Sequence, residues 1–230
     1  STIVGLSQVV LGEKVTIESG TDRLGNPGGI TLLASSNLQV TDQIDLTTGG
    51  LLQAAGVNSN VKATLNNSVL IGVSNRLLSK GTIGVGTFTN ANVSTSSEVS
   101  TFGLAAVGSA EATSKVTTTQ TVNVGQNTIL EGYGNVTLTP GRDPRGVSDT
   151  VIQGNSSAQG YVRGLIAVPV ADATTDLTSN ASLDVGMNAK IRSGQNVTIG
   201  AYPGVPSPIA DGTGRGYQLG FIPVTDHDSN

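Results

Sequence analysis

Residues 103–139 read GLAAVGSAEATSKVTTTQTVNVGQNTILEGYGNVTLT, and residues 164–200 read GLIAVPVADATTDLTSNASLDVGMNAKIRSGQNVTIG. Aligned without a gap, the two stretches are identical at 14 of 37 positions. The identical pairs are Gly103/Gly164, Leu104/Leu165, Ala106/Ala167, Val107/Val168, Ala110/Ala171, Ala112/Ala173, Thr113/Thr174, Thr117/Thr178, Val124/Val185, Gly125/Gly186, Asn127/Asn188, Asn135/Asn196, Val136/Val197 and Thr137/Thr198. An ungapped register over the whole window indicates copies of one structural unit, as in proteins that stack repeats.

Two glycine positions mark each unit. The units open at Gly50, Gly103, Gly164 and Gly220, and the spacings between these openings are unequal: 53, 61 and 56. A further glycine follows each of the first three openings at a constant offset of 22, at Gly72, Gly125 and Gly186. The first half of the unit therefore has a fixed length, and the second half absorbs the variation. Since insertions collect in surface loops, we expect the loops in the second half.

These landmarks define the organisation of the chain. The repeat units are 50–102, 103–163 and 164–219, with the tail of a unit at 1–49 and the start of another at 220–230. Because both ends cut through a repeat, we expect 1–230 to be one continuous segment of a longer repetitive polypeptide, or of a subunit that continues across a head-to-tail joint.

The composition favours strands. Of 230 residues, 31 are glycine, 3% are aromatic and 12% are charged, against roughly 25% charged residues in ordinary domains. The interior must be made of Val, Ile, Leu and Ala, and Ser, Thr, Asn and Gly supply most of the remainder. This mixture predicts an all-β protein rich in turns.

Charge and cysteine content narrow the possible functions. The net charge of −4 and the pI near 4.8 argue against a nucleic-acid partner, because no basic face can displace counterions from phosphates. The absence of cysteine excludes disulfides, thiolate metal sites and cysteine nucleophiles. No run approaches the ~20 apolar residues of a membrane-spanning helix, so we expect no membrane-spanning segment.

In the first half of each unit, apolar and polar residues alternate with a period of two and in a shared phase. One phase holds Ala106, Ala110, Ala112, Val116, Val122 and Val124, then Ala167, Ala171, Ala173, Leu177, Leu183 and Val185, then Ala55, Val61, Ala63, Leu65, Val69 and Ile71. The charged residues Lys62, Glu111, Lys115, Asp172, Asp176 and Asp184 take the other phase. This pattern predicts strands with one dry face. Lys62, Lys115 and Asp176 share one unit position, so we expect an outward row of mixed charge.

Such strands must bury their dry faces against neighbouring copies. We therefore predict a right-handed parallel β-helix, or β-solenoid, whose coils pair at ~4.8 Å. With a coil on the order of 20 residues, each unit would cover two to three coils. We expect bends at Asn127, Asn188, Asn135, Asn196, Asn155 and Asn180, because asparagine tolerates left-handed backbone. A β-sandwich is the alternative, although it does not explain the repeat.

The stretches AEATSKVTTTQTVNVGQNTILEGYGNVTLTPG (110–141) and ADATTDLTSNASLDVGMNAKIRSGQNVTIGAYPG (171–204) resemble repeats of giant bacterial filamentous adhesins of the filamentous haemagglutinin and leukotoxin-like type. The resemblance covers roughly residues 9–225, and its motifs are degenerate. It implies a right-handed parallel β-helix shaft, secreted to the cell surface, that supports adhesion, biofilm or filament formation without catalytic residues. The family's NPNGI secretion element matches NPGGI at 26–30 only loosely.

Candidate sites are few. The only histidine, His227, lies between Asp226 and Asp228. This grouping has the composition of a divalent-metal site, or with Ser229 of a Ser-His-Asp relay. A solvated turn at the chain end is the favoured interpretation. We predict no metal site, cofactor site or catalytic residue.

The densest charge cluster is GRDPRGVSD at 141–149, with Arg142, Asp143, Arg145 and Asp149. Calcium-dependent polysaccharide cleavage on a β-helix would use acids and a base of this kind. The favoured interpretation is an insertion loop whose charges pair or stay solvated. It is favoured because the tyrosines are expected to be too scattered for a sugar-stacking platform; they are Tyr133, Tyr161, Tyr202 and Tyr217.

Two further motifs are weak. DGTGRG at 211–216 only distantly resembles a calcium-binding nonapeptide. The threonine-rich stretches Thr117–Thr121 and Ser94–Thr101 have the composition of ice-binding rows. Polar outer strand faces are the favoured interpretation of both stretches.

The expected function is a structural, non-enzymatic shaft segment of a secreted bacterial filamentous adhesin or of a self-assembling extracellular surface fibre. The expected partners are further copies or adjoining repeats placed end to end, and host or matrix glycans, with no nucleic acid. The alternative is a β-helical protein that binds or cleaves polysaccharide, including a lectin-like module that would use the variable loops after Gly72, Gly125 and Gly186.

Overall fold

The computed structural model describes residues 1–218 and 228–229. Within them the chain forms strands and no helices, and every pair of named strands is parallel. This confirms the all-β prediction. The described residues also contain no helix of the length and apolarity that crossing a membrane requires.

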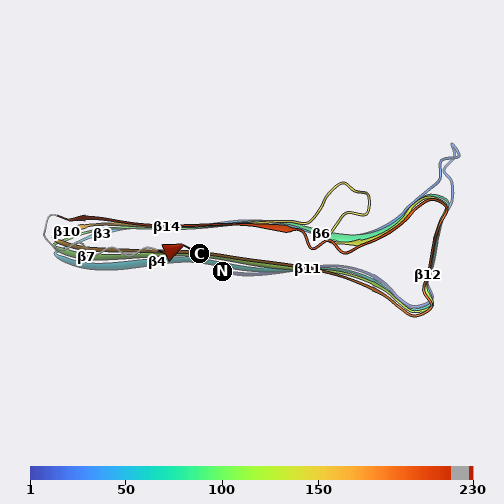
Figure 1. The fold of residues 1–230 in the computed structure, drawn as a ribbon, viewed down its shortest axis with the longest axis horizontal. Helices are drawn as coiled ribbons and strands as arrows, with labels where there is room; N and C mark the ends of the chain where they lie inside the picture. The colour runs from blue at the N-terminus through green and yellow to red at the C-terminus, as the bar shows by residue number, and fades with distance from the viewer. Residues whose placement is uncertain (219–227, 230) are drawn as a thin grey trace.

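The chain passes in turn through three sheets, and one complete pass is called a coil here (Figure 1). The first long sheet has the order β1-β4-β7-β11-β15, with β1 (Thr2–Leu11), β4 (Leu52–Ile71), β7 (Ala105–Val124), β11 (Ile166–Val185) and β15 (Asp228–Ser229). The short sheet has the order β12-β8-β5-β2, with β2 (Thr16–Ser19), β5 (Arg76–Ser79), β8 (Ile129–Gly132) and β12 (Lys190–Ser193).

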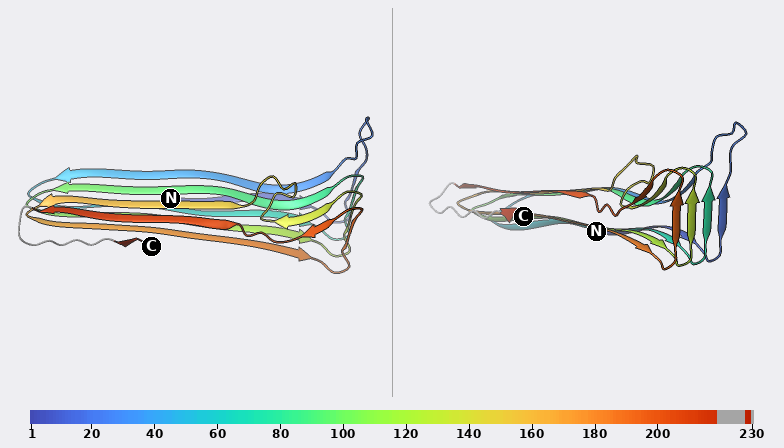
Figure 2. Two further views of the ribbon diagram at one scale, coloured as in Figure 1. Left: turned by 45° about the horizontal axis from the view of Figure 1, so that its top comes forward. Right: turned by 45° about the vertical axis from the view of Figure 1, so that its right-hand side comes forward.

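The second long sheet closes each coil. It comprises β3 (Ile30–Gly49), β6 (Ile83–Phe102), β9 (Val136–Pro140), β10 (Val151–Gly164), β13 (Val197–Ile199) and β14 (Val205–Gln218). The two long sheets lie face to face, meet at a narrow edge and diverge towards a wide edge, where the short sheet joins them (Figure 1). The short strands stand side by side across this wide edge (Figure 2).

One repeat unit makes one coil. Ala105, in the second complete unit, pairs with Leu52 of the unit before it and with Ile166 of the unit after it. The expectation of two to three coils per unit is therefore wrong. Strands β4, β6, β7 and β11 have 20 residues each, so one strand alone uses the length assumed for a complete coil. At about 3.3 Å per residue each long face is about 66 Å wide.

The length variation lies in the second half of the unit, as expected. Residues 83–86 of β6 pair with β9, and residues 90–102 pair with β10. The loop 141–150 thus interrupts what is a continuous strand in the preceding coil, and 200–204 interrupts the next coil in the same way. In the first coil the added residues lie instead at 20–29, between β2 and β3. Both larger loops project from the body of the molecule (Figure 1).

The alternating pattern places the predicted apolar phase inside. Every apolar residue of this phase on β7 is buried, and the charged residues of the opposite phase, such as Lys115 and Asp172, face outwards. Val124 is fully buried, whereas its partner Val185 is 40% exposed because β11 has no further strand beside it at that position in the described residues. Lys62 and Asp176 flank Lys115 in one outward row, and Lys115 forms an ion pair with Asp176.

Two polar strips cross the interior between the apolar clusters. The wide-side strip contains Ser36, Asn67, Thr89 and Gln120; the narrow-side strip contains Ser59, Thr95, Ser97, Ser114 and Ser156. In the first, Asn67 Nδ2 donates to Thr89 Oγ1 at 2.8 Å. In the second, the Ser114 and Ser156 hydroxyls lie 2.8 Å apart. Hydrogen bonding of buried polar groups is what makes such strips tolerable.

The glycine landmarks form two columns at the corners of the coils. A Cβ atom on Gly103 would lie 2.4 Å from the Gly50 oxygen, and one on Gly125 would lie 2.5 Å from the Gly72 oxygen. Any side chain there would overlap the backbone of the preceding coil. The fixed spacing between the columns therefore follows from the length of the long strand that joins them.

The asparagines divide into two groups. Asn127 and Asn188 have positive φ values of 57° and 60° in the turn after the second glycine column. Asn135 lies at the next corner, where its Oδ1 accepts from the Asn196 backbone N–H at 3.2 Å. The expectation is wrong for Asn155 and Asn180, which lie within β10 and β11. Both occupy exposed, outward strand positions, where an amide side chain stays solvated.

The stack has open edges in the described residues. Strand β3 pairs only with β6, and β14 pairs only with β10. At one end β2 pairs only with β5, and at the other β12 pairs only with β8. This parallel pairing between coils differs from the antiparallel pairing of ordinary β-sandwiches.

Candidate functional site

The charged loop 141–150 is held by its own ion pairs. Arg142 Nε and Nη2 donate to the two carboxylate oxygens of Asp149 at 2.5 and 2.9 Å. The Arg142 guanidinium also lies 4.1 Å from the centre of the Tyr202 ring. The hydrogen bond to Asp149 raises the pKa of Arg142, as a paired guanidinium requires.

Asp143 is the buried acid of this loop. It accepts from Arg145 at three atoms: the backbone N at 2.8 Å, Nε at 3.0 Å and Nη2 at 2.6 Å. These hydrogen bonds lower the pKa of Asp143, and burial opposes the shift. Each acid is thus saturated by an arginine of its own loop. This geometry fits the insertion-loop interpretation, because no pair of free carboxylates faces a common space here.

The other sequence candidates do not form a site in the described residues. Asp226 and His227 lie outside the described residues, while Asp228 and Ser229 form β15 beside β11. The segment 211–216 lies inside strand β14, where the chain is extended. Across the described ranges, 1–218 and 228–229, no group of three His, Cys, Asp or Glu side chains could hold a metal ion.

The threonine-rich stretches split between the two faces of their strands. On β7, Thr118 is buried and bonds Ser179 at 3.0 Å, while Thr117 and Thr119 face outwards. On β6, Thr95, Ser97 and Thr101 are all buried. Only part of each stretch therefore reaches the surface, and part of it builds the interior polar strips.

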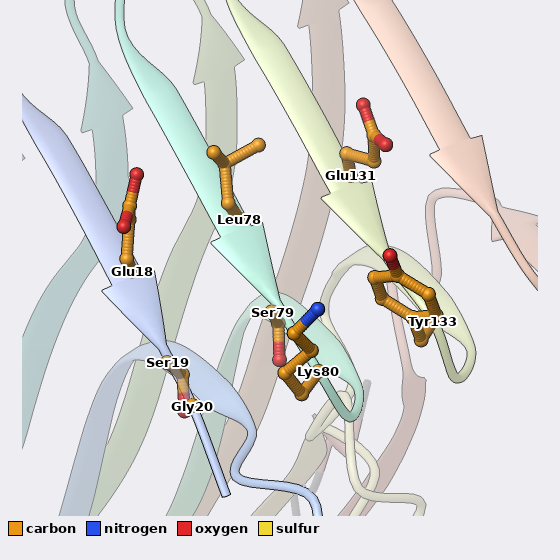
Figure 3. Close-up of a pocket in the computed structure, with 8 residues that line it drawn as sticks. All are labelled: Glu18, Ser19, Gly20, Leu78, Ser79, Lys80, Glu131 and Tyr133. Atoms are coloured by element: carbon orange, nitrogen blue, oxygen red, sulfur yellow. The ribbon is translucent and has the colours of Figure 1, made fainter.

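A shallow hollow of about 300 Å³ lies on the short sheet (Figure 3). Glu18, Leu78 and Glu131 form one outward row across β2, β5 and β8, and both carboxylates rise beside Leu78. The Lys80 Nζ lies 4.4 Å from the centre of the Tyr133 ring at the strand ends. Leu78 lies between the two glutamates, so their strand positions are two strand spacings apart, about 9.6 Å. The two carboxylates therefore do not converge on one point in the hollow.

A second surface gathers aromatic and arginine side chains, and sequence reasoning missed it. The aromatic–arginine patch consists of Phe102, Tyr161, Arg163, Arg215 and Tyr217, all on the outer face of the second long sheet. The Tyr161 and Tyr217 ring centres are 5.0 Å apart, and those of Phe102 and Tyr161 are 6.2 Å apart. The expectation that the tyrosines are scattered is wrong for this pair, although Tyr133 and Tyr202 do lie elsewhere.

The patch arises from a small shift in strand register. The motifs GYVRG at 160–164 and GYQLG at 216–220 suggest that Tyr161 and Tyr217 are equivalent positions. In the structure the register of β10 and β14 is shifted from this alignment, which places Tyr217 beside Arg163 and Arg215 beside Tyr161. Arg163 lies between Phe102 and Tyr217 in one row. The only signal in the sequence was the recurrence of tyrosine and arginine at these two strand ends.

Comparison with known proteins gives no family for this chain. No protein-family model matches it. No curated protein and no solved structure matches it either. The similarity to filamentous adhesins therefore remains a proposal.

Proposed function

We propose that this chain is a non-catalytic structural segment of an extracellular fibre, a right-handed parallel β-solenoid that lengthens by the addition of coils. The observation that carries the proposal is the in-register stacking of one repeat per coil in three parallel sheets, whose end strands keep largely open edges within residues 1–218 and 228–229. An open strand edge presents unpaired N–H and C=O groups that another strand can satisfy.

The two ends of the stack are complementary in their inward rows. If a second copy or a further repeat placed its first coil on the fourth coil, the rows would bring Leu177 beside Ile3, Leu183 beside Val9 and Ile191 beside Ile17. These side chains are only partly buried and pack against the existing apolar clusters. Contact between the ends would remove that apolar area from water, which favours stacking.

Electron microscopy and fibre diffraction of the purified chain test this proposal. We expect ribbons with a spacing near 4.8 Å along the fibre axis, roughly the distance between paired strands, formed at high protein concentration. The Gly12→Ala variant is the matched test: a Cβ there meets nothing within 4 Å in one chain, but it points towards an incoming coil. The variant should stay folded and lose assembly. Wild-type chain that remains monomeric at every concentration would contradict self-stacking.

A tandem fusion of two copies tests continuation within one polypeptide. If adjoining repeats continue the stack, the fusion should double the axial length and keep the cross-section, as measured by small-angle scattering. Two separate bodies joined by a linker would contradict the solenoid assignment.

The proposed location of the fibre is the bacterial cell surface, where it would serve adhesion or biofilm formation; this part of the proposal rests on the sequence resemblance. Surface labelling of a producing bacterium tests it. The alternative of a polysaccharide-cleaving enzyme has less support, because the acids of the loop 141–150 are bound to arginines. Polysaccharide binding has a specific observation in its favour, the aromatic–arginine patch.

A further inference from the structure

We propose that the aromatic–arginine patch binds an acidic polysaccharide, with sugar rings against Tyr161 and Tyr217 and sugar carboxylates on Arg163 and Arg215. The proposal adds a ligand site to a molecule whose proposed function is otherwise structural. It stands or falls independently of assembly, because a single chain carries all five residues.

The patch is not part of the core. Its residues take the outward phase of β6, β10 and β14, while the inward neighbours Thr101 and Val162 are fully buried. Other outward positions in the same two rows hold Gly49, Thr47 and Ser100. The chain has only 3 Phe and 4 Tyr, so the placement of three aromatic residues on one outer patch is not required for packing.

The patch alternates rings and cations over three neighbouring strands. One row runs Phe102, Arg163 and Tyr217, and the adjacent row places Tyr161 beside Arg215. The Arg163 guanidinium lies 5.4 Å from the Tyr161 ring centre and 5.6 Å from that of Tyr217. The tyrosine rings thus hold Arg163 by cation–π contacts, and its hydrogen-bonding edge stays available.

The arginines of the patch carry charge for which the described residues supply no ion pair. In the described part of the chain, Arg163 and Arg215 form no ion pair, which they share with several other surface cations, but only these two unpaired arginines lie beside tyrosine rings. The adjoining outward row contains the acids Asp45 and Glu98, so the positive surface is small. Two guanidiniums on an acidic protein suit a ligand with widely spaced carboxylates.

These features select the class of ligand. A sugar ring has an apolar C–H face that packs on an aromatic ring, and a guanidinium binds a carboxylate through two parallel hydrogen bonds. A nucleic acid also combines rings and anions, but it carries a phosphate charge about every 3.4 Å along each strand and needs a larger basic surface. A neutral glycan would leave the arginines unused. The flat, open sheet fits a chain of sugars lying along the stack.

The test is a binding measurement on the purified chain with polygalacturonate, neutral dextran and a single-stranded oligothymidylate as probes. We expect polygalacturonate to bind and dextran to bind far more weakly, with affinity that falls as salt is raised. The single variant Tyr161→Ala should weaken binding by roughly tenfold or more, and so should the double variant that combines Arg163→Gln with Arg215→Gln. Because all three positions face outwards, thermal unfolding should change little.

Two control variants separate the patch from the rest of the surface. Tyr133→Ala removes an exposed tyrosine just after the end of β8, and it should leave polygalacturonate binding unchanged. Glu98→Gln removes an acid beside the patch and should leave binding equal or tighter. The proposal is overturned if polygalacturonate does not bind, if the patch variants bind as well as wild type, or if the oligothymidylate binds at least as tightly.

Discussion

At the scale of single residues, the corner glycines are set by what lies beside them in the neighbouring coil. Gly125→Ala would place a methyl group 2.5 Å from the Gly72 backbone, and we expect it to lower the free energy of unfolding by about 1–3 kcal/mol. Gly12 occupies the equivalent position, and a Cβ atom there would meet nothing within 4 Å. The Gly12→Ala variant should therefore change the free energy of unfolding by less than about 0.5 kcal/mol. Urea unfolding of both variants measures the difference. Equal effects would argue that local backbone preference, and not stacking, selects glycine.

The buried acid of the charged loop makes the loop sensitive to pH. The folded protein lowers the pKa of Asp143 below its ordinary value of 3.8, so the carboxylate stabilises the loop above that value. This stabilisation is lost as the pH falls through the lowered pKa. We expect NMR titration of the Asp143 carboxyl to show the lowered pKa, and loop amides to exchange faster in acid. In Arg145→Gln the pKa should return towards the ordinary value; an unchanged pKa would contradict the role of Arg145.

Residue types alone predicted the positions of the coil corners better than they predicted which side chains become neighbours on the surface. Repeated glycines marked both columns, because backbone overlap admits no other residue there. Asparagine alone did not identify bends: Asn127 and Asn155 differ only in whether the strand has ended, which depends on pairing. The aromatic–arginine patch was not predictable because a small shift in strand register decides which side chains become neighbours.

At the scale of strands and sheets, the alternating pattern predicted the faces correctly but not the length of a coil. The alternation of apolar and polar residues shows which face of a strand is buried. The position of the next turn depends instead on the glycine columns. The polar residues on the inward phase, such as Asn67 and Gln120, also interrupt the apolar pattern without ending the strand. They are tolerated because the facing sheet supplies acceptors for both side-chain NH₂ groups, although it leaves Gln120 Oε1 without a partner in the described residues.

The wide-side polar strip offers a test of this account. Asn67 accepts from the Ser36 hydroxyl and donates to the Phe88 carbonyl and Thr89 Oγ1. The Asn67→Leu variant would therefore remove a hydrogen-bonding partner from each of these groups. We expect it to lower the free energy of unfolding by more than about 2 kcal/mol.

Gln120→Leu is the matched control for this test. In the described residues Gln120 Oε1 is buried without a hydrogen-bonding partner, and Thr89 would keep its bond from Asn67. The variant should therefore be within about 1 kcal/mol of wild type. Calorimetric unfolding that ranks the two variants in the reverse order would contradict the strip as a source of stability.

At the scale of the whole molecule, one inward acid opposes continuation of the stack. Asp42 faces inwards on the open edge strand β3 and accepts from the Ser59 hydroxyl at 2.8 Å. A coil added beyond β3 would bury this carboxylate further, which is costly without a cation. We therefore expect Asp42→Asn to assemble at a lower protein concentration than wild type, as measured by light scattering. Assembly that is unchanged or weaker would show that another surface limits growth.

The long strands have a mechanical consequence. Each coil adds only about 4.8 Å along the stacking axis, whereas its long strands make it about 66 Å wide; its thickness grows from the narrow edge to the wide edge but stays well below this width (Figure 1). A stack with this cross-section is a tape, because a beam that is broader than it is thick resists bending in its broad plane more than in its thin direction. In the fibre proposed above, such a tape would bend easily in one direction only, and each added coil would contribute more surface area than length.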